Sequence, residues 1–260
     1  MESRRLAGND PEKTGAFSFL RHLPQEWRER RVLALVEDLG HQMGRDPMAA
    51  LGRLDALAQT LPDDPSAHAG WSMSVCAWVE RWASAEPIIA RRLLDDLADH
   101  AARHPGEAAL KAHWAVAILH FVAARAGADP EGCRVLLATL EPHLLAPGAP
   151  LALRRLWAMA GQRWVIALSG TNGQAALAGL GAVASLALRI ASETPTDLSI
   201  VSLWLETVMG MMTPENLQEA WVRAAIFQQA QALEAAYYRH GTIAAALSGL
   251  QLILREDPPE

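Results

Sequence analysis

The hydrophobic positions of the chain repeat with a period of 43 residues. Trp71, Trp114 and Trp157 are each separated by 43 residues, and Trp204 follows after 47. Four and seven residues after the first three tryptophans the chain again carries small, apolar or aromatic residues, namely Val75, Ile118 and Gly161, and then Trp78, Phe121 and Trp164. Offsets of zero, four and seven lie on one face of an α-helix. The pattern predicts one helix with a buried face in each period.

A second set of apolar positions lies between these tryptophan stripes. Its members are Leu51, Leu94, Leu137 and Leu180, followed three residues later by Leu54, Leu97, Leu140 and Val183. Prolines at 62, 105, 147, 150 and 195 fall between the stripes, where a helix must end because proline disrupts a helix interior. Sustained alternation of apolar and polar residues, the signal of a strand, is absent. Each period is therefore predicted to be a helical hairpin in an all-α chain.

A single hairpin cannot bury its own apolar face, whereas stacked hairpins share a continuous core. We therefore expect an α-solenoid of about five stacked antiparallel hairpins in a single domain over residues 24–256. The predicted units are 24–63, 64–106, 107–148, 149–194 and 195–240, with a closing helix at 242–254, a flexible leader at 1–23 and a tail at 257–260. The longer fourth spacing predicts an extra helical turn near residues 192–197.

The first helix of each predicted hairpin resembles that of the tetratricopeptide repeat, in which an aromatic residue is followed by a small residue and a second aromatic. The segment WAMAGQRW, residues 157–164, fits this pattern, and WSMSVCAW and WAVAILHF fit it with valine or isoleucine at the small position. The family repeat has about 34 residues, so the helices here would each be extended by close to a turn. HEAT-type repeats match the observed length without the paired aromatics and stay open as the alternative.

The resemblance implies that first helices line a concave groove, and that residues beside the tryptophan stripe face into it. These residues are Ala69, Ser72, Cys76, Val79, Glu80, Ala112, Ala115, Leu119, Val122, Arg155, Ala158, Gln162, Val165 and Ile166. Because they are mostly apolar and small, they suit an apolar or amphipathic peptide. We expect a non-enzymatic interaction module, a scaffold or adaptor, that binds a partner protein or another copy of itself. Ala115→Arg or Ala158→Arg should then abolish binding without unfolding the protein.

Composition and charge narrow the choice of partner and compartment. The 260-residue chain carries a net charge of -6 and has no basic stripe, so nucleic acid is not an expected partner. Two cysteines give no disulfide framework, and we expect a cytoplasmic protein. Residues 164–188 contain no charge and are long enough to span a membrane. The segment SGTNGQ, residues 169–174, divides them, and we expect two helices and no membrane span.

The acidic segment LLDDLADH, residues 93–100, is a candidate metal site. Asp95, Asp96 and Asp99 fall opposite the apolar stripe of their helix, which predicts a solvated face, with Arg92–Asp96 and Asp99–Arg103 as ion pairs four residues apart. The alternative is a metal-dependent all-α enzyme that uses these three acids.

The histidines give a second candidate. His100 and His104 are four residues apart, and with His113 and His120 on the next helix they have a spacing that could bind zinc. No acidic base lies between the first pair, and Arg103 would repel a cation. We expect surface or interface histidines, and we predict no metal, no cofactor and no catalytic residue.

Overall fold

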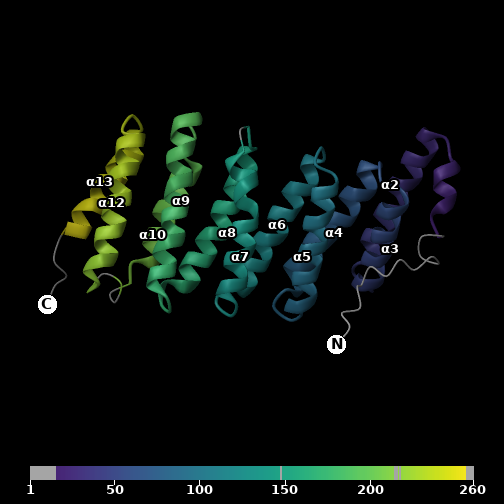
Figure 1. Ribbon diagram of the computed structural model, residues 1–260, viewed down its shortest axis with the longest axis horizontal. Helices are drawn as coiled ribbons and strands as arrows, with labels where there is room; N and C mark the ends of the chain where they lie inside the picture. Colours follow the sequence, from purple (N-terminus) through teal and green to yellow (C-terminus); the bar gives the residue numbers. More distant parts are fainter. Residues whose placement is uncertain (1–15, 147, 214–215, 217, 256–260) are drawn as a thin grey trace. The chain divides into compact units, whose positions relative to one another are not determined.

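The computed structural model describes residues 16–146, 148–213, 216 and 218–255. Over these residues the protein is all-helical, with eleven α-helices, one short 3-10 helix and no strand. The chain divides into two compact units, one ending at Ala117 and the other starting at Ile118. Figure 1 shows the order of the elements. The prediction of an all-α fold is confirmed.

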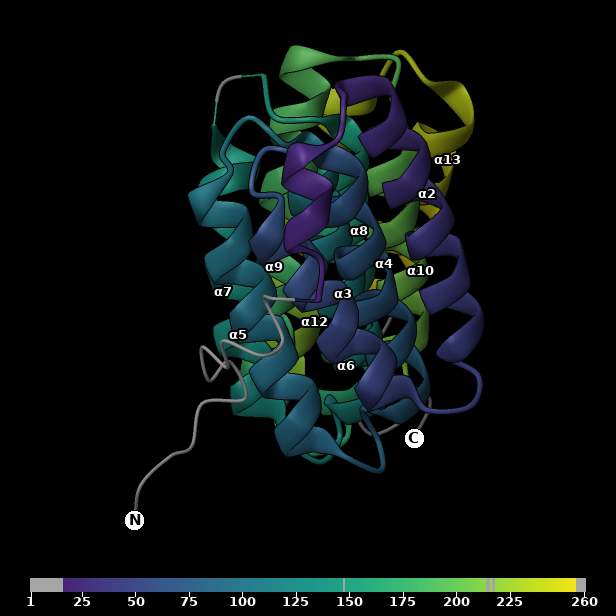
Figure 2. The ribbon, with the colours of Figure 1, turned by 90° about the vertical axis from the view of Figure 1, so that its right-hand side faces the viewer.

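The first unit contains a short 3-10 helix and the helices that follow it. Their bounds are η1 Ser18–His22, α2 Gln25–Gln42, α3 Pro47–Thr60, α4 Pro65–Trp82 and α5 Pro87–Arg103, with α6 Ala108–Arg125 crossing into the second unit. These helices run alongside one another (Figure 2). Helix α4 packs against α2, α3 and α5, and α2 packs against α3. Neighbouring helices along the chain therefore form hairpins, and the first helices of successive hairpins touch.

The second unit follows the same plan. Its helices are α7 Pro130–Leu145, α8 Leu151–Ser169, α9 Gly173–Glu193, α10 Ser199–Met211, α12 Ala220–Tyr237 and α13 Gly241–Arg255. Helix α8 packs against α7, α9 and α10, and α12 packs against α9 and α13. Three of the predicted ranges hold a packed pair of helices, α2–α3, α4–α5 and α8–α9, and residues 242–254 lie in α13. The hairpins at 107–148 and 195–240 stay predictions. This arrangement is compatible with a helical-repeat fold.

Aspartate–proline pairs mark where several helices begin. Asp46, Asp64 and Asp129 each precede the first proline of a helix, and each carboxylate accepts a hydrogen bond from a main-chain N–H of the first turn. Asn172 does the same for α9. Such caps satisfy N–H groups that have no partner inside the helix, and proline suits the first turn because its missing N–H is not needed there. The prolines that start these helices, Pro47, Pro65 and Pro130, are not the ones named as helix breakers in the sequence.

The two apolar stripes form the core, as predicted. Trp71, Trp114 and Trp157 are 4–6% exposed, and Trp204 is fully buried. The second-helix positions are buried too: Leu51, Leu94, Leu137, Leu180, Leu54, Leu97, Leu140 and Val183. The indole N–H of Trp157 donates to the carbonyl of Leu137 at 3.0 Å. Burial of the indole ring and the hydrogen bond of its N–H group together hold α8 against α7.

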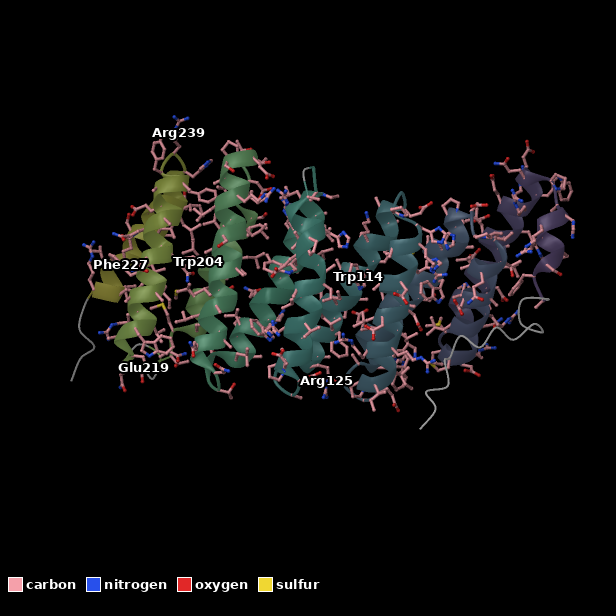
Figure 3. The ribbon with its side chains drawn as sticks, viewed as in Figure 1. Trp114, Arg125, Trp204, Glu219, Phe227 and Arg239 are labelled. Carbon is pink, nitrogen blue, oxygen red and sulfur yellow. The ribbon has the colours of Figure 1, made fainter. Side chains whose placement is uncertain are left out.

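The last hairpins use the same kind of contact. The indole N–H of Trp204 on α10 donates to the side-chain oxygen of Gln229 on α12 at 3.0 Å, with Trp204 lying among the helices of this unit (Figure 3). Phe227, also on α12, lies beside the C-terminal helix (Figure 3), where the guanidinium of Arg255 is 5.0 Å from the ring centroid. These contacts tie α10 and α13 to α12.

Helix α9 is longer than the other second helices of described hairpins. It has 21 residues, whereas α5 has 17 and α7 has 16. The extra turn ends at Glu193, near the place predicted from the spacing of 47 residues, so that expectation is confirmed. Gly179 lets this helix lie close to α8, because a Cβ at that position would be only 2.6 Å from the ring of Trp164.

Part of the predicted leader is structured. Residues 18–22 form η1, in which Leu20 is fully buried, and the Nε–H of Arg21 donates to the carbonyl of Thr60 at 2.8 Å. This short helix was not predicted, because the segment is short and lies outside the 43-residue pattern. The predictions for residues 1–15 and 257–260 lie outside the described residues. The single domain over 24–256 and the solenoid stay predictions.

The uncharged run at 164–188 is divided as predicted, since α8 ends at Ser169 and α9 begins at Gly173. Among the described residues, α9 is the helix long and apolar enough to cross a membrane, judged by length and composition alone. In its most apolar window, 44% of the residues are buried within the protein. The core helix of a folded domain has these same properties, so this is weak evidence for a span.

Candidate functional site

The predicted groove residues fall into two rows on their helices, and one row is buried. This row lies one residue beyond the tryptophan stripe and contains Ser72, Val79, Ala115, Val122, Ala158 and Val165, all 0–1% exposed. Cys76 is nearly as buried, at 8%. In this structure these side chains face the protein's own core, so the expectation that they line an open groove is wrong for them.

Contacts between first helices explain the burial. The hydroxyl of Ser72 on α4 is 2.7 Å from Nδ1 of His113 on α6, and the Cys76 thiol donates to the carbonyl of His113 at 3.0 Å. Burial raises the pKa of the Cys76 thiol to about 12, so this sulfur stays protonated and is not a thiolate nucleophile. Burial also lowers the pKa of His113. An arginine at position 115 or 158 would enter such a packed face and destabilise the protein. Neither substitution would therefore test binding separately from stability.

The other row is accessible and is best developed on α8. It consists of Arg155, Met159, Gln162 and Ile166, which are spaced by four, three and four residues and therefore share one face. Arg155 is exposed and Gln162 half-buried, while Met159 and Ile166 are 41% and 38% exposed. The sequence analysis named three of these four and missed Met159. Ala69, Glu80, Ala112 and Leu119 lie in the equivalent rows of α4 and α6 and are half-buried or exposed.

Polar contacts from α10 fix the polar members of this row. Arg155 donates through Nη2 to the Asp197 carboxylate at 2.6 Å and through Nε to the Ser199 hydroxyl at 2.8 Å. Burial acts to raise the pKa of Asp197, but hydrogen bonds from Ser199 and Arg155 outweigh it and hold the pKa below its ordinary value. Gln162 donates to Glu206 at 3.4 Å. The side chains are therefore held in place on the α8–α10 surface.

An apolar patch lies beside these polar contacts. It consists of Met159 and Ile166 on α8 and Met209 on α10, which is 66% exposed; we call it the α8–α10 patch. Gly210 brings the two helices together there, since a Cβ on it would be 3.1 Å from Cδ1 of Ile166. Exposed methionine and isoleucine side chains on a well-packed surface are candidates for contact with a partner protein.

The three aspartates of α5 do not all point in the same direction. Asp95 is exposed and forms an ion pair with Arg91 at 3.2 Å, while the Arg103 Nε–H donates to the main-chain carbonyl of Asp99. Neither predicted ion pair, Arg92–Asp96 or Asp99–Arg103, is formed between these described side chains: Asp95 pairs with Arg91 instead, and Arg103 bonds the main chain of Asp99 and not its carboxylate. Burial raises the pKa of Asp96, and the positive charge of Arg92 acts against that rise.

A polar cavity of about 740 Å³ lies between α3 and α5, with Trp71 of α4 also lining it. Asp96, Asp99 and His100 of α5 face it, whereas Asp95 does not. The other residues around it are Met48, Ala49, Leu51, Gly52, Asp55, Gln59, Arg92, Leu93 and Arg103. The mixed charges of this lining favour a polar occupant, such as water or a polar segment of peptide.

Three histidines meet next to this cavity. His68 comes from the first turn of α4, and His100 and His104 come from the end of α5. The ring centroids are 4.4–4.8 Å apart, and the potential ligand nitrogens all lie within 4.8 Å of one another. His113, which the sequence analysis grouped with His100 and His104, instead contacts Ser72. Among the described residues this trio is the group of side chains with metal-ligating geometry.

Two members of the trio have lowered pKa values, which favours their neutral form. Burial, together with the neighbouring His68, His104 and Arg103, lowers the pKa of His100 to about 3. The pKa of His104 is lowered by burial, His68 and Arg103, while Glu107 and Asp63 act in the opposite direction. Neutral imidazoles carry a free lone pair and are the form that binds metal ions.

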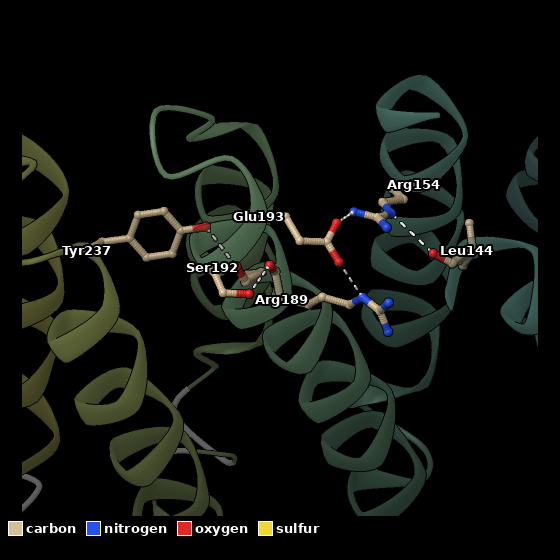
Figure 4. Close-up of polar contacts among 7 residues, drawn as sticks. Leu144, Arg154, Arg189, Ser192, Glu193 and Tyr237 are labelled. Carbon is tan, nitrogen blue, oxygen red and sulfur yellow. Dashed lines mark hydrogen bonds and ion pairs between the residues drawn. The ribbon is translucent and has the colours of Figure 1, made fainter. Parts of the chain in front are cut away.

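A second hairpin carries an ion pair at its end, between the buried Arg154 and the exposed Glu193 (Figure 4). Arg154 on α8 is 3% exposed; its Nε donates to the carbonyl of Leu144 at 3.1 Å and its Nη1 to Glu193 on α9. Glu193 also accepts from Arg189, and the hydrogen bonds from Arg154 and then Arg189 lower its pKa. Tyr237 of α12 donates to the carbonyl of Ala187 at 2.8 Å, which anchors α12 to the same helix.

Comparisons with protein-family models, with curated proteins and with solved structures find no match. The case for a function therefore rests on the α8–α10 patch, the cavity beside α5 and the histidine trio.

Proposed function

We propose that the protein is a non-enzymatic interaction module, a scaffold or adaptor, that binds an amphipathic peptide segment of a partner protein. The observation that carries the proposal is the α8–α10 patch. Met159, Ile166 and Met209 place apolar side chains on a surface whose backbone is held by packed helices. A helical peptide docks by placing its own apolar face on such a surface.

The polar neighbours of the patch suit the rim of such an interface. Arg155 is exposed on one side, and Glu206 is exposed next to Gln162. Charges at a rim orient a partner and contribute more to specificity than to affinity, whereas the desolvated apolar centre contributes most of the binding energy. The expected ligand is therefore a segment with an apolar stripe flanked by both signs of charge.

The test is a selection from a displayed library of amphipathic helical peptides, carried out on the full chain. Selected peptides are then titrated by calorimetry against wild type, the Met159→Arg/Ile166→Arg variant and an Ile88→Arg control. Ile88 is 85% exposed on α5 and belongs to the first unit, so the control makes the same chemical change at a residue outside the patch. Both positions in the double variant are at the surface, and the fold should tolerate it.

We expect the double variant to bind the selected peptides at least about tenfold more weakly, because losing one buried aliphatic contact costs about 1.5 kcal/mol or more. The Ile88→Arg control should bind like wild type. Equal affinity of wild type and the double variant would rule out the patch, and a library that yields no binder to wild type would argue against the interaction module itself.

A further inference from the structure

The histidine trio joins the two ends of one hairpin. His68 lies one turn into α4, and His100 and His104 lie in the last turns of α5, so the three rings bridge the start of the first helix and the end of the second. His68 and His100 are 1% and 6% exposed, while His104 is half-buried and reaches the surface. A small ion could therefore enter past His104 and meet two imidazoles that are already fixed by packing.

The hydrogen-bonding pattern defines which nitrogens are available. Nε2 of His68 is 2.8 Å from the carbonyl of Pro62, and because a carbonyl only accepts, this nitrogen carries the proton. Nδ1 of His68 is then the lone-pair atom, and it lies 2.6 Å from Nε2 of His100. Metal-binding histidines commonly donate their other N–H to a carbonyl in this way, which fixes the ring and its tautomer.

We propose that His68, His100 and His104 form a zinc site, with water in the fourth position. Three imidazole ligands and one open position are a known coordination for Zn²⁺. In the metal-free state the proton on Nε2 of His100 fills the space between the two buried rings. On binding, Nε2 becomes the ligand and the proton moves to Nδ1 of the same neutral ring, so that no net proton is released.

The geometry requires only small movements. Two nitrogens bound to one tetrahedral zinc at about 2.0 Å lie about 3.3 Å apart, so Nδ1 of His68 and Nε2 of His100 must separate by less than an ångström from 2.6 Å. The ligand nitrogen of His104 lies within 4.8 Å of the other two, so it must approach by up to about 1.5 Å, and its partial exposure leaves room for the ring to turn. Zinc suits the site because neutral nitrogen ligands favour it over calcium or magnesium.

The positive charge of Arg103 does not block the site. Its Nε–H is bound to the carbonyl of Asp99 at 3.2 Å, which directs this part of the guanidinium toward its own helix. The carboxylates of Glu107 and Asp63 act on His104 with the opposite sign. The sequence analysis argued against zinc from the lack of an acidic base between His100 and His104 and from the charge of Arg103, and it did not consider His68. The new site shares only His100 and His104 with the set named there.

The test uses the full chain without a polyhistidine tag, stripped with a chelator and titrated with zinc chloride. We expect one zinc per chain and a rise of about 5 to 10 °C in the melting temperature at a hundredfold excess over the dissociation constant. The His104→Ala variant should lose both effects, whereas His120→Ala, a half-buried histidine on α6 outside the trio, should keep them. Equal zinc responses in wild type and His104→Ala would overturn the site, as would a wild-type protein that does not respond.

A measurement on the wild type alone covers the case in which a variant fails to fold. X-ray absorption of the zinc-loaded chain should show three imidazole ligands at about 2.0 Å, and cobalt(II) in place of zinc should give the intense visible bands of a four-coordinate ion. A shell with fewer than three imidazoles would overturn the proposal. Because no peptide is present, the outcome is independent of the proposed function.

Discussion

The α4–α5 and α8–α9 hairpins each join the start of the first helix to the end of the second, but they use different side chains to do so. Their positions correspond at an offset of 86 residues, two periods of the repeat, so that His68, His100 and His104 match Arg154, Leu186 and Ile190. His68 and Arg154 are both fourth in their helices, and both donate to a carbonyl just before the hairpin, at 2.8 and 3.1 Å. One hairpin then closes with two more imidazoles and the other with a carboxylate.

The cavities beside these hairpins differ in the same way. The cavity at α3 and α5 is lined by Asp96, Asp99 and His100, whereas the equivalent positions at α7 and α9 are Ala182, Ser185 and Leu186 around a space of about 190 Å³. The comparison indicates that the two hairpins share their backbone arrangement and their buried tryptophans. A few different residues at equivalent positions make one hairpin polar and the other apolar. Neutral imidazoles leave lone pairs for a ligand, and a closed ion pair leaves none.

The largest expected effect comes from removing the arginine from the α8–α9 hairpin. Arg154→Leu deletes the buried guanidinium and leaves the Leu144 carbonyl without its donor, and we expect it to lower the free energy of unfolding by about 3 kcal/mol. Arg163→Leu, on the exposed side of the same helix, should change it by less than about 0.5 kcal/mol. Denaturant titration measures both. Similar values for the two variants would contradict a structural role for the buried arginine.

Acid should weaken the two hairpins over different pH ranges. The folded-state pKa of His100 is about 3, below its ordinary 6.5, so its contribution to stability is complete above pH 6.5 and is lost as the pH falls toward 3. The pKa of Glu193 is lowered from its ordinary value of 4.5, so the contribution of Glu193 to stability is complete above pH 4.5 and is lost only below that pH.

Between pH 6.5 and 4.5 the α4–α5 hairpin alone should therefore lose protection, by about 2 kcal/mol. Hydrogen exchange of the zinc-free protein, corrected for the intrinsic rate at each pH, resolves the two hairpins. Equal loss of protection in both would show that the histidines do not determine the acid response.

The smallest effect concerns how the two first helices begin. The Asp64 carboxylate caps α4 by accepting from the N–H groups of Ser66 and Ala67, whereas α8 begins after Pro150 with no side-chain cap. Asp64→Ala should cost about 1 kcal/mol. Glu86→Ala is the matched control, because Glu86 precedes α5 without making a cap bond. If the control costs as much in thermal unfolding, the cap is not responsible for the difference.

Periodicity in the sequence was enough to predict the helices and their buried faces. The tryptophan and leucine stripes, the hairpin joints and the extra turn of α9 all follow from spacing, because burial of one helical face leaves a regular trace. The groove was predicted less well. Which side of a first helix meets its neighbour depends on how successive hairpins are stacked, and a period alone does not determine this; hence Ala158 and Val165 are buried and Met159 is exposed.

The histidine trio could have been found with one further step. In an antiparallel hairpin the start of the first helix lies beside the end of the second, so His68 should have been compared with His100 and His104 before His113. The burial of Arg154 has a similar signal, since it lies three residues before Trp157 as His68 lies before Trp71. Hydrogen-bond directions and the depth of burial required the structure.

The extra turn of α9 supplies the carboxylate that pairs with the buried Arg154. A chain with Arg154 but without the turn would carry a buried positive charge with no carboxylate from α9, whereas a chain with the turn alone would have Glu193 paired with Arg189 at 2.8 Å. The insertion is tolerable by itself and the arginine is not. In related chains we therefore expect a buried arginine at this position only together with the longer helix.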